Sequence, residues 1–432
     1  MTTGSELAVW WREPGGDRPP AGWWTEVGEG SFRENEHRIT GRHRLPGYVP
    51  DWAEDLFRVA RAAFIADKYT RRAVARDRWT RRIRLSVPVA AYETWRGADT
   101  RLAALLQILT ADLWEVELRP LVGHHVQEAM SDSEDVRAGE VSTLSGGLDS
   151  LSWAAVRARA GLSTPMLLVM FSEGNNLVGL QRRVYESVER LPGGRPLMLL
   201  EMSQTPSGQR LEPSSRTRGL LYAAGAVRAA AAHGVGTVHV PENGQLALNP
   251  PLTPARSAAC STRSVHPWTL ARLNELIVAV AGSRRAVQVA NPWAWMTKGE
   301  VCKAGSGAGL SVADLEATLS CGKSPTNYRG GPPNCGICFP CLVRRSGLLF
   351  AHEGDSTRYQ DSPWSSEISV ERRKNWRALQ RWLLSPYTLS DVLTDVPLPP
   401  DTDPVAAFDL IMRGRGELTR LLGMAGEDAV AA

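Results

Sequence analysis

The sequence predicts an α/β protein built around a doubly wound parallel sheet, and three observations support this fold class. From Glu140 onward, strand-sized apolar runs alternate with helix-sized amphipathic segments. The longer strand candidates, at 166–171 and 197–202, are almost continuously apolar, which is typical of parallel sheets covered by helices on both faces. A glycine-rich turn joins the first strand candidate to the first helix candidate. The strands are expected at 141–144, 166–171, 197–202, 237–240 and 286–289, with helices at 150–160, 177–191, 220–232 and 268–281.

The region before this sheet reads as an α+β accessory domain. A helix signal follows Pro50, and alternating apolar residues at 83–89 and 114–119 predict two strands with one buried face each. A polar connector at 131–135 separates this region from the central sheet. The expected parts are an N-terminal accessory domain (1–138), a central domain (139–350) and a helical C-terminal extension (351–432).

Composition places the chain among ordinary globular proteins. Of 432 residues, 43% are hydrophobic and 22% are charged, and the net charge is only +4. These values exclude the disordered and strongly cationic classes. No apolar run reaches the roughly 18 residues of a membrane-spanning helix. The first residues contain neither a basic nor a hydrophobic segment, so we expect a cytoplasmic protein that has no membrane partner.

Arginines gather around Trp79, where seven of them accompany a single acid, Asp77. Such a cluster is able to bind the phosphates of a nucleic acid. The alternative, which we favour, is a solvated helix end followed by an amphipathic strand. The arginines of this cluster are Arg71, Arg72, Arg76, Arg78, Arg81, Arg82 and Arg84.

The turn at 145–150 has the sequence Ser-Gly-Gly-Leu-Asp-Ser. Adjacent glycines let the backbone direct its N–H groups toward an anion, and the start of the following helix favours negative charge. Ser145 and Ser150 add hydroxyl donors. Asp149 fits a phosphate site only if it orients the loop or holds a magnesium ion. The alternative is a chance Gly-Gly turn.

Four of the six cysteines crowd into residues 321–341. In a chain expected to be cytoplasmic, this crowding favours a metal site over disulfides. Four thiolates fill every position of a tetrahedral zinc site, so the ion would be structural. An iron–sulfur cluster and simply reduced, buried thiols are the alternatives. The predicted ligands are Cys321, Cys335, Cys338 and Cys341.

The loop at 145–150 resembles the S-G-G-x-D-S loop of the ATP pyrophosphatase (PP-loop) superfamily, whose members split ATP into AMP and pyrophosphate while adenylating a substrate. With the cysteine segment, it resembles the QueC family of 7-cyano-7-deazaguanine synthases over about residues 141–349. The resemblance includes Thr297 and Lys298 before the cysteines and Arg344 after them. It implies a Rossmann-like PP-loop domain, ATP with Mg²⁺, structural Zn²⁺ and a 7-deazaguanine carboxylate as substrate.

An adenylating enzyme must place a carboxylate against the α-phosphorus of ATP and neutralise the departing pyrophosphate. Candidate cations near strand ends or helix starts are Arg216, Arg218 and Lys298, with surface ion pairs as the alternative for the arginines. Thr217 replaces the asparagine of the family's arginine–asparagine signature. The predicted catalytic residues are Ser145, Asp149, Arg218 and Lys298. The predicted nucleotide contacts are Leu144, Ser145, Gly146, Gly147, Asp149, Ser150, Phe171, Ser172 and Arg216.

Four other residues are expected to meet the deazaguanine. Glu242 and Asn243 directly follow the fourth central strand, and a carboxylate beside an amide matches the donors and the carbonyl of a purine-like base. Arg263 or His266 would then meet the carboxylate of the substrate. A turn at Asn243 and Gly244, and a helix cap at His266, are the structural alternatives.

The N-terminal domain, the C-terminal extension and the segment at 241–267 depart from the shorter QueC pattern. They resemble the longer QueC-like proteins of bacterial anti-phage systems, first those of the Qat system and second those of type IV CBASS. For that group the resemblance implies transfer of an activated deazaguanine carboxylate to nitrogen, either ammonia or an amine on a protein partner of the defence operon. The rival functions are direct modification of nucleic acid and a nucleotide-binding scaffold without turnover.

Overall fold

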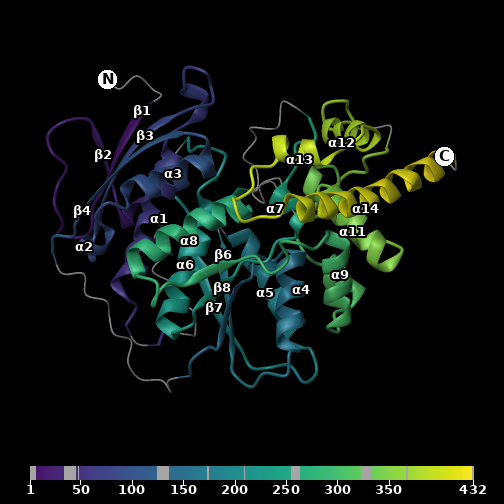
Figure 1. The fold of residues 1–432 in the computed structure, drawn as a ribbon, viewed down its shortest axis with the longest axis horizontal. Coiled ribbons are helices and arrows are strands. Elements are labelled where there is room, and N and C mark those ends of the chain that lie inside the picture. Colours follow the sequence, from purple (N-terminus) through teal and green to yellow (C-terminus); the bar gives the residue numbers. More distant parts are fainter. Residues whose placement is uncertain are drawn as a thin grey trace.

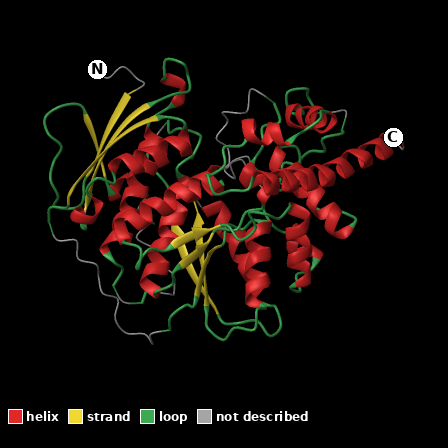
Figure 2. Ribbon diagram, viewed as in Figure 1, coloured by secondary structure: helices red, strands yellow, loops and turns green. Residues whose placement is uncertain are grey.

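The computed structural model describes residues 6–33, 45–46, 48–123, 136–172, 175–208, 210–253, 263–322, 332–365 and 368–430. Within this part of the chain, the N-terminal sheet lies at one end of the molecule, the central sheet follows, and the C-terminal helices lie at the other end (Figure 1). Helices pack between the sheets and around the central one (Figure 2).

The central sheet has five parallel strands in the order β7-β6-β5-β8-β9. The first strand of this sheet, β5, lies at its centre. The next two, β6 and β7, follow on one side of β5, and the last two, β8 and β9, lie on its other side. This reversal confirms the predicted doubly wound topology, in which ligands bind at the carboxyl ends of the strands beside the reversal. The strands are β5 (Glu140–Thr143), β6 (Met166–Ser172), β7 (Leu197–Ser203), β8 (Thr237–His239) and β9 (Gln288–Ala290).

Strand β6 shows why the longer central strands are almost continuously apolar. Leu167 and Val169 pack into one core with helices α6 and α8. Met166 and Leu168 pack into another core with helices α4, α5 and α9. Because successive side chains of a strand point to opposite faces, a sheet covered on both faces needs apolar residues at every position. These helices are α4 (Leu148–Ala158), α5 (Asn175–Glu189), α6 (Arg218–His233), α8 (Pro267–Ala281) and α9 (Lys298–Gly307).

The N-terminal region combines helices with a second sheet, as expected for the α+β part of the chain. Its strands are all parallel, in the order β2-β1-β3-β4. The two strands predicted from alternation are present as β3 and β4, whereas β1 and β2 were not predicted. The elements are β1 (Glu6–Trp11), β2 (Trp24–Val27), α1 (Asp51–Tyr69), β3 (Arg82–Val89), α2 (Tyr92–Trp95), α3 (Asp99–Thr110) and β4 (Leu113–Pro120).

One apolar core runs from the N-terminal sheet to the central sheet. Helix α1 contacts β3 on one side and α6 on the other, and it is buried along most of its length. The same core contains Trp11 of β1, Phe64 of α1 and Leu221 of α6. Residue 138 stays the predicted domain boundary, but packing is continuous across it. The connector expected at 131–135 lies outside the described residues.

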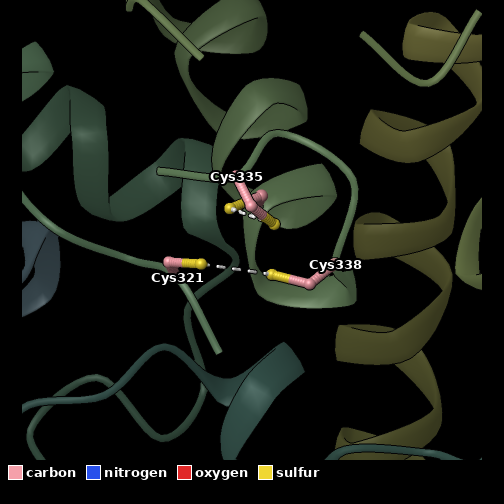
Figure 3. Close-up of side chains that lie close together, drawn as sticks. Cys321, Cys335 and Cys338 are labelled. Carbon is pink, nitrogen blue, oxygen red and sulfur yellow. Dashed lines mark hydrogen bonds between the residues drawn. The ribbon is translucent and has the colours of Figure 1, made fainter. Parts of the chain in front are cut away.

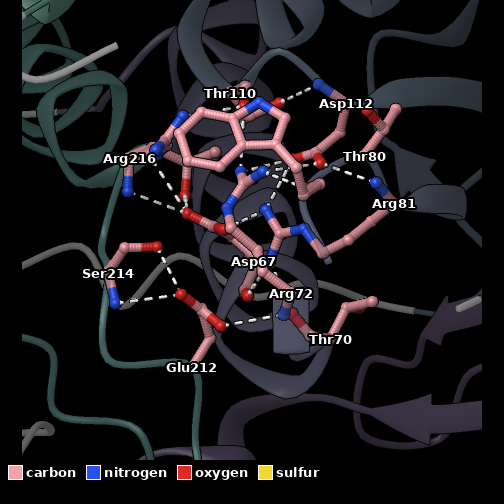
Figure 4. Close-up of polar contacts among 12 residues, drawn as sticks. Asp67, Thr70, Arg72, Thr80, Arg81, Thr110, Asp112, Glu212, Ser214 and Arg216 are labelled. Atoms are coloured by element: carbon pink, nitrogen blue, oxygen red, sulfur yellow. Dashed lines mark hydrogen bonds and ion pairs between the residues drawn. The ribbon is translucent and has the colours of Figure 1, made fainter. Parts of the chain in front are cut away.

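Buried charges fasten the N-terminal region to the start of α6 (Figure 4). Arg81, just before β3, is fully buried and donates to Asp67 and Asp112, each at 2.6 Å. Asp67 also accepts the backbone N–H groups of Arg216 (3.0 Å) and Thr217 (3.1 Å). Burial alone lowers the pKa of Arg81, but its bonds to the two aspartates outweigh this effect and raise it. The guanidinium therefore stays charged inside the protein.

This network uses part of the arginine cluster around Trp79. Arg72 donates to Asp112 at 2.7 Å and lies over the Trp79 ring at 5.4 Å. Arg216 lies over the same ring at 4.6 Å. Arg72 and Arg81 are buried and paired, so they serve the fold and are not available to the phosphates of a nucleic acid. The exposed members are Arg71, Arg76, Arg78, Arg82 and Arg84.

Replacing Arg81 with alanine is expected to lower the free energy of unfolding by about 3–5 kcal/mol, because the buried Asp67 would lose its arginine and the buried Asp112 would keep only Arg72. Urea denaturation followed by circular dichroism measures this loss. Arg84→Ala is the matched control: its pair with Glu115, at 4.0 Å, is exposed and should be worth at most about 1 kcal/mol. Equal losses in the two variants would contradict a structural role for the buried network.

Helices form the C-terminal extension, as predicted. The long helix α14 packs on α7, α11, α12 and α13. Among the helices of the described residues, none has both the length and the apolar character required to cross a membrane. The remaining helices are α7 (Gly244–Leu248), α10 (Val312–Glu316), α11 (Phe339–His352), α12 (Lys374–Leu384), α13 (Leu389–Asp395) and α14 (Pro404–Val430).

Candidate functional site

The loop at 145–150 joins the end of β5 to the start of α4, and two serines hold it closed. Ser145 Oγ lies 3.1 Å from Ser150 Oγ, which also donates to the Gly147 carbonyl at 3.0 Å. The N–H of Ser145 donates to Ser150 Oγ at 3.2 Å, and the N–H of Gly147 donates to Ser145 Oγ at 3.3 Å. Leu144, just before the loop, is fully buried in the core beneath it.

Both glycines suit a loop that an anion can approach. Gly146 has φ +82°, and a Cβ there would lie 2.8 Å from Leu180 Cδ2, so a side chain would be both strained and crowded. Gly147 is the N-cap of α4 and, having no side chain, makes no side-chain cap. The N–H groups of the first turn of α4 are therefore left for an outside acceptor, and the helix start favours negative charge.

Asp149 is the most constrained polar residue of the loop. Its Oδ2 accepts from Lys298 Nζ at 2.5 Å and from Asn243 Nδ2 at 3.2 Å. Its backbone carbonyl accepts from Trp293 Nε1 at 3.1 Å. Its Oδ1 is buried and has no N–H or hydroxyl partner among the described residues. Asp149 and Lys298 therefore form a buried ion pair with one carboxylate oxygen left over.

Glu242 and Asn243 lie beside this pair, after the end of β8. Glu242 Oε1 accepts from Asn243 Nδ2 at 2.8 Å. Burial raises the pKa of Glu242 well above its ordinary value, and the charge of Asp149 raises it further, although Lys298 partly offsets both. Asn243 Oδ1 accepts the Leu246 N–H at 3.1 Å and so also caps α7. Asn243 thus has the structural role considered for it and also contacts the two carboxylates.

The meeting of these groups follows from the topology. The loop follows β5, Glu242 follows β8, and Lys298 begins the helix after β9. Since β5, β8 and β9 are parallel neighbours, their carboxyl ends lie at one edge of the sheet. The structure brings together Ser145, Gly146, Gly147, Asp149, Ser150, Glu242, Asn243 and Lys298 at this edge.

Phe171 and Ser172, two of the predicted nucleotide contacts, are buried at the carboxyl end of the neighbouring strand β6. Gln181 of α5 links this strand end to the loop: its Nε2 donates to the carbonyls of Phe171 (3.0 Å) and Ser145 (3.4 Å). Sequence reasoning missed Gln181, because it is a single polar residue on an amphipathic helix and belongs to no motif.

The predicted arginines contact other partners. Arg216 donates to the Thr110 carbonyl at 3.2 Å and lies over Trp79. Arg263 donates to the Ile108 carbonyl at 3.4 Å. Both acceptors belong to α3 of the N-terminal region. Arg218, the first residue of α6, lies 5.9 Å from the Tyr222 ring, and that ring stacks on Phe171 at 4.4 Å. Through Tyr222, Arg218 thus lies near Phe171, a predicted nucleotide contact, whereas Arg216 and Arg263 contact α3.

His266 caps helix α8, which is the structural alternative raised for it. Its Nδ1 accepts the Trp268 N–H at 3.1 Å. Burial, assisted by Arg263, lowers the pKa of His266 to about 4. The unfolded chain would protonate this ring near its ordinary pKa of 6.5, so the unfolded state binds more protons than the folded state between about pH 6.5 and 4.

We therefore expect stability to fall as the pH drops from about 6.5 to 4, with part of the slope due to His266. Substitution His266→Asn keeps a side chain that can cap α8 but removes the titrating group. Urea denaturation at several pH values should give a shallower slope for this variant in that range. An unchanged slope would show that His266 is not buried in its neutral form.

The four cysteines of the 321–341 segment form one cluster (Figure 3). Cys321 Sγ lies 3.9 Å from Cys338 Sγ, and Cys335 Sγ lies 3.9 Å from Cys341 Sγ. All four sulfur atoms lie within 4.8 Å of one another. Zinc–sulfur bonds of about 2.3 Å in a tetrahedron place sulfurs about 3.8 Å apart. The cluster can therefore hold a single metal ion such as zinc, and it leaves little room for an iron–sulfur core.

The residues just before the cysteine cluster hydrogen-bond to the glycine loop at 145–150. Leu319, two residues before Cys321, donates its N–H to the Gly146 carbonyl at 3.0 Å. Asn334, beside Cys335, donates to the Thr318 carbonyl at 3.0 Å. The buried Arg344 of α11 donates to Thr318 Oγ1 at 2.6 Å. The cluster thus fixes a short segment that in turn holds one side of the glycine loop.

A family model and several known proteins match parts of this chain. The family model described as "Queuosine biosynthesis protein QueC" matches residues 267–352, from the start of α8 to the end of α11. A 7-cyano-7-deazaguanine synthase of Thermoplasma acidophilum is 30% identical over 93 residues, which cover 22% of this chain and 35% of the relative. The one from Cupriavidus taiwanensis is 40% identical over 65 residues, or 15% of this chain and 26% of the relative.

A longer match has lower identity. The 7-cyano-7-deazaguanine synthase of Methanothrix thermoacetophila is 25% identical over 245 residues, which cover 51% of this chain and 98% of the relative. The first two relatives are matched over only about a third and a quarter of their own lengths. The fold, the cysteine cluster and these matches agree: the chain is similar to QueC-like PP-loop proteins, with the family match running from α8 through the cysteine cluster to α11.

Proposed function

We propose that this protein is an ATP-dependent enzyme that adenylates the carboxylate of a 7-deazaguanine, such as 7-carboxy-7-deazaguanine, and transfers the activated group to nitrogen. The observation that carries the proposal is the meeting of the glycine loop with Asp149, Lys298 and Glu242 at the carboxyl ends of β5 and β8. The similarity to 7-cyano-7-deazaguanine synthases supports the class of substrate.

In the first step, a carboxylate oxygen of the substrate attacks the α-phosphorus of ATP. The bond from that phosphorus to the oxygen bridging to the β-phosphorus breaks, and pyrophosphate leaves. The N–H groups at the start of α4 stabilise the negative charge of the pyrophosphate. In the second step, an amine nitrogen attacks the acyl carbon, a C–N bond forms, AMP leaves, and the nitrogen loses its surplus proton to solvent.

The two acidic residues, Glu242 and Asp149, have different roles in this scheme. The raised pKa of Glu242 favours its protonated form, which can donate a hydrogen bond to Asp149 or to an acceptor of the substrate. Asp149, whose buried Oδ1 has no partner among the described residues, offers a carboxylate oxygen of the kind that Mg²⁺ prefers, so it fits that ion. When bound with ATP, Mg²⁺ would neutralise part of the phosphate charge.

The test is to incubate the purified protein with ATP, Mg²⁺ and 7-carboxy-7-deazaguanine, and to measure AMP and pyrophosphate. We expect both products only when the acid is present, and much less of both with Ser145→Ala. Ser187→Ala is the control, because that hydroxyl bonds within its own helix to the Arg183 carbonyl. ATP cleavage that does not depend on the acid, or no cleavage at all, would contradict the proposal. The second result would instead favour a nucleotide-binding scaffold.

We further propose that the nitrogen acceptor is an amine on a protein partner of an anti-phage defence operon. The support is the resemblance to longer QueC-like defence proteins, and the presence of folded regions on both sides of the matched segment 267–352. Mass spectrometry of candidate partners after coexpression should show an added deazaguanine. Unchanged partner masses beside active AMP release would leave ammonia as the acceptor and overturn this part of the proposal.

A further inference from the structure

The C-terminal extension reaches the candidate site through one carboxylate. Glu417 of α14 is buried, with 3% of its surface exposed. Its Oε2 accepts the Gly299 N–H at 3.1 Å, and its Oε1 accepts the Thr297 hydroxyl. These two partners stand on either side of Lys298, whose ammonium pairs with Asp149. The family match ends at residue 352, so α14 lies wholly outside it.

Glu417 completes the set of acceptors at the start of α9. The first N–H groups of a helix lack partners within it, and here side-chain oxygens satisfy each of them. Thr297 and Glu300 cap each other, and Lys298 donates its N–H to Gln245 Oε1 at 2.7 Å. Glu417 supplies the acceptor for Gly299. Its negative charge also suits the positive end of the helix.

Tight packing links Glu417 to Lys298. A Cβ at Gly299 would lie 2.6 Å from Glu417 Oε1, so the carboxylate rests directly against the helix backbone. A Cβ at Gly347 would lie 2.4 Å from Lys298 Cγ, so the stem of the lysine is enclosed by α11. One turn earlier on α14, Arg413 donates to Glu300 Oε1 (2.9 Å) and thus attaches the same helix to α9 a second time.

We propose that Glu417 is a positioning residue for the reaction: it holds the first turn of α9 so that the Lys298 ammonium stays against Asp149. The proposal rests on the proposed function. Lys298 is the group that meets the reacting phosphates, and Glu417 acts through it. The C-terminal extension is thereby part of the working site, although it contributes no group to the glycine loop.

Burial raises the pKa of Glu417 to about 7; its bonds to Thr297 and Gly299 oppose that rise. The charged groups that face it are Glu300 and Lys298 on α9, and the Cys302 thiol, which burial keeps neutral, lies in the same helix. Protonation turns one acceptor oxygen into a donor, so one of the two bonds to α9 is lost. We therefore expect activity to fall as the pH drops below about 7.

The test compares Glu417→Ala and Glu417→Gln with Leu418→Ala. Leu418 is also buried on α14 but packs into the core formed with α7, α11 and α12. For Glu417→Ala we expect kcat for AMP release to fall about tenfold to a hundredfold, with KM for ATP nearly unchanged because the glycine loop is intact. For Glu417→Gln we expect a smaller loss and no fall in activity near pH 7.

Hydrogen exchange provides a second measurement that does not need activity. Amides in the peptide covering residues 297–301 should exchange faster in Glu417→Ala than in the unaltered protein or in Leu418→Ala. The proposal is overturned if this peptide is unaffected, or if activity falls in proportion to lost melting temperature in all three variants. If the unaltered protein releases no AMP, the proposed function fails, and hydrogen exchange still decides whether Glu417 holds α9.

Discussion

Replacing Asp149 with asparagine should reduce AMP release by about a hundredfold or more, because the site loses the charge that orients Lys298. The shape of the side chain is retained, so the glycine loop keeps its course. Lys298→Met should cause a comparable loss by removing the positive charge that faces the phosphates. Single-turnover release of AMP, measured with saturating ATP and acid, is the suitable assay.

The double variant Asp149→Asn with Lys298→Met separates chemistry from folding. Leaving one member of a buried ion pair without its partner costs about 3–5 kcal/mol, whereas replacing both members is often close to neutral. We therefore expect each single variant to lose stability and the double variant to recover most of it while remaining inactive. A double variant that regains activity together with stability would show that the pair is only structural.

Removal of the metal should have the second large effect. Structural zinc sites contribute about 10–16 kcal/mol of apparent binding free energy in small peptides, and here the cluster also holds Leu319 against Gly146. We expect one tightly bound ion per chain, measured by elemental analysis. Cys335→Ser should lose that ion, lower the melting temperature and weaken ATP binding by at least about tenfold.

Cys302→Ala is the matched control for this experiment. Cys302 is buried in α9, outside the cluster, and burial raises the pKa of its thiol to about 12, so it stays neutral. Its replacement should leave both the metal content and the affinity for ATP intact. If Cys335→Ser binds ATP as tightly as the Cys302 variant does, the cluster does not support the glycine loop.

The central fold could be predicted because its longer strands have a local signature and its strand candidates alternate with amphipathic helix segments. In β6, residues 166–171 are all apolar and are bounded by turns, which is the pattern of a strand covered on both faces. β2 has no such signature, because it has only four residues and is half-buried. β1 does contain an apolar run at residues 7–11, which was not recognised as a strand. β1 pairs with β3 across more than 70 positions of sequence, as Leu7 and Ile83 show. Parallel pairings of that range leave no local pattern.

Some residues of the candidate site could be predicted from local motifs, and others could not. The glycine loop and the cysteines are local motifs, so their residues could be chosen from spacing alone. The pairing of Asp149 with Lys298 depends on the strand order. The contacts of Arg216 and Arg263 depend on where α3 packs, and sequence reasoning had no basis for placing that helix. Glu417 and Gln181 belong to no motif and become visible only through their hydrogen bonds.

The apolar core that joins the N-terminal and central sheets limits how this chain can be shortened. Helices α6 and α8 cover one face of the central sheet, and their outer sides are covered in turn by α1, α2 and α3. A fragment beginning near residue 139 would expose those outer sides to water and would lose the aspartate that holds the start of α6. The central region is therefore not expected to fold without the N-terminal region, and shortened versions made for crystallisation or for transfer into another protein should aggregate.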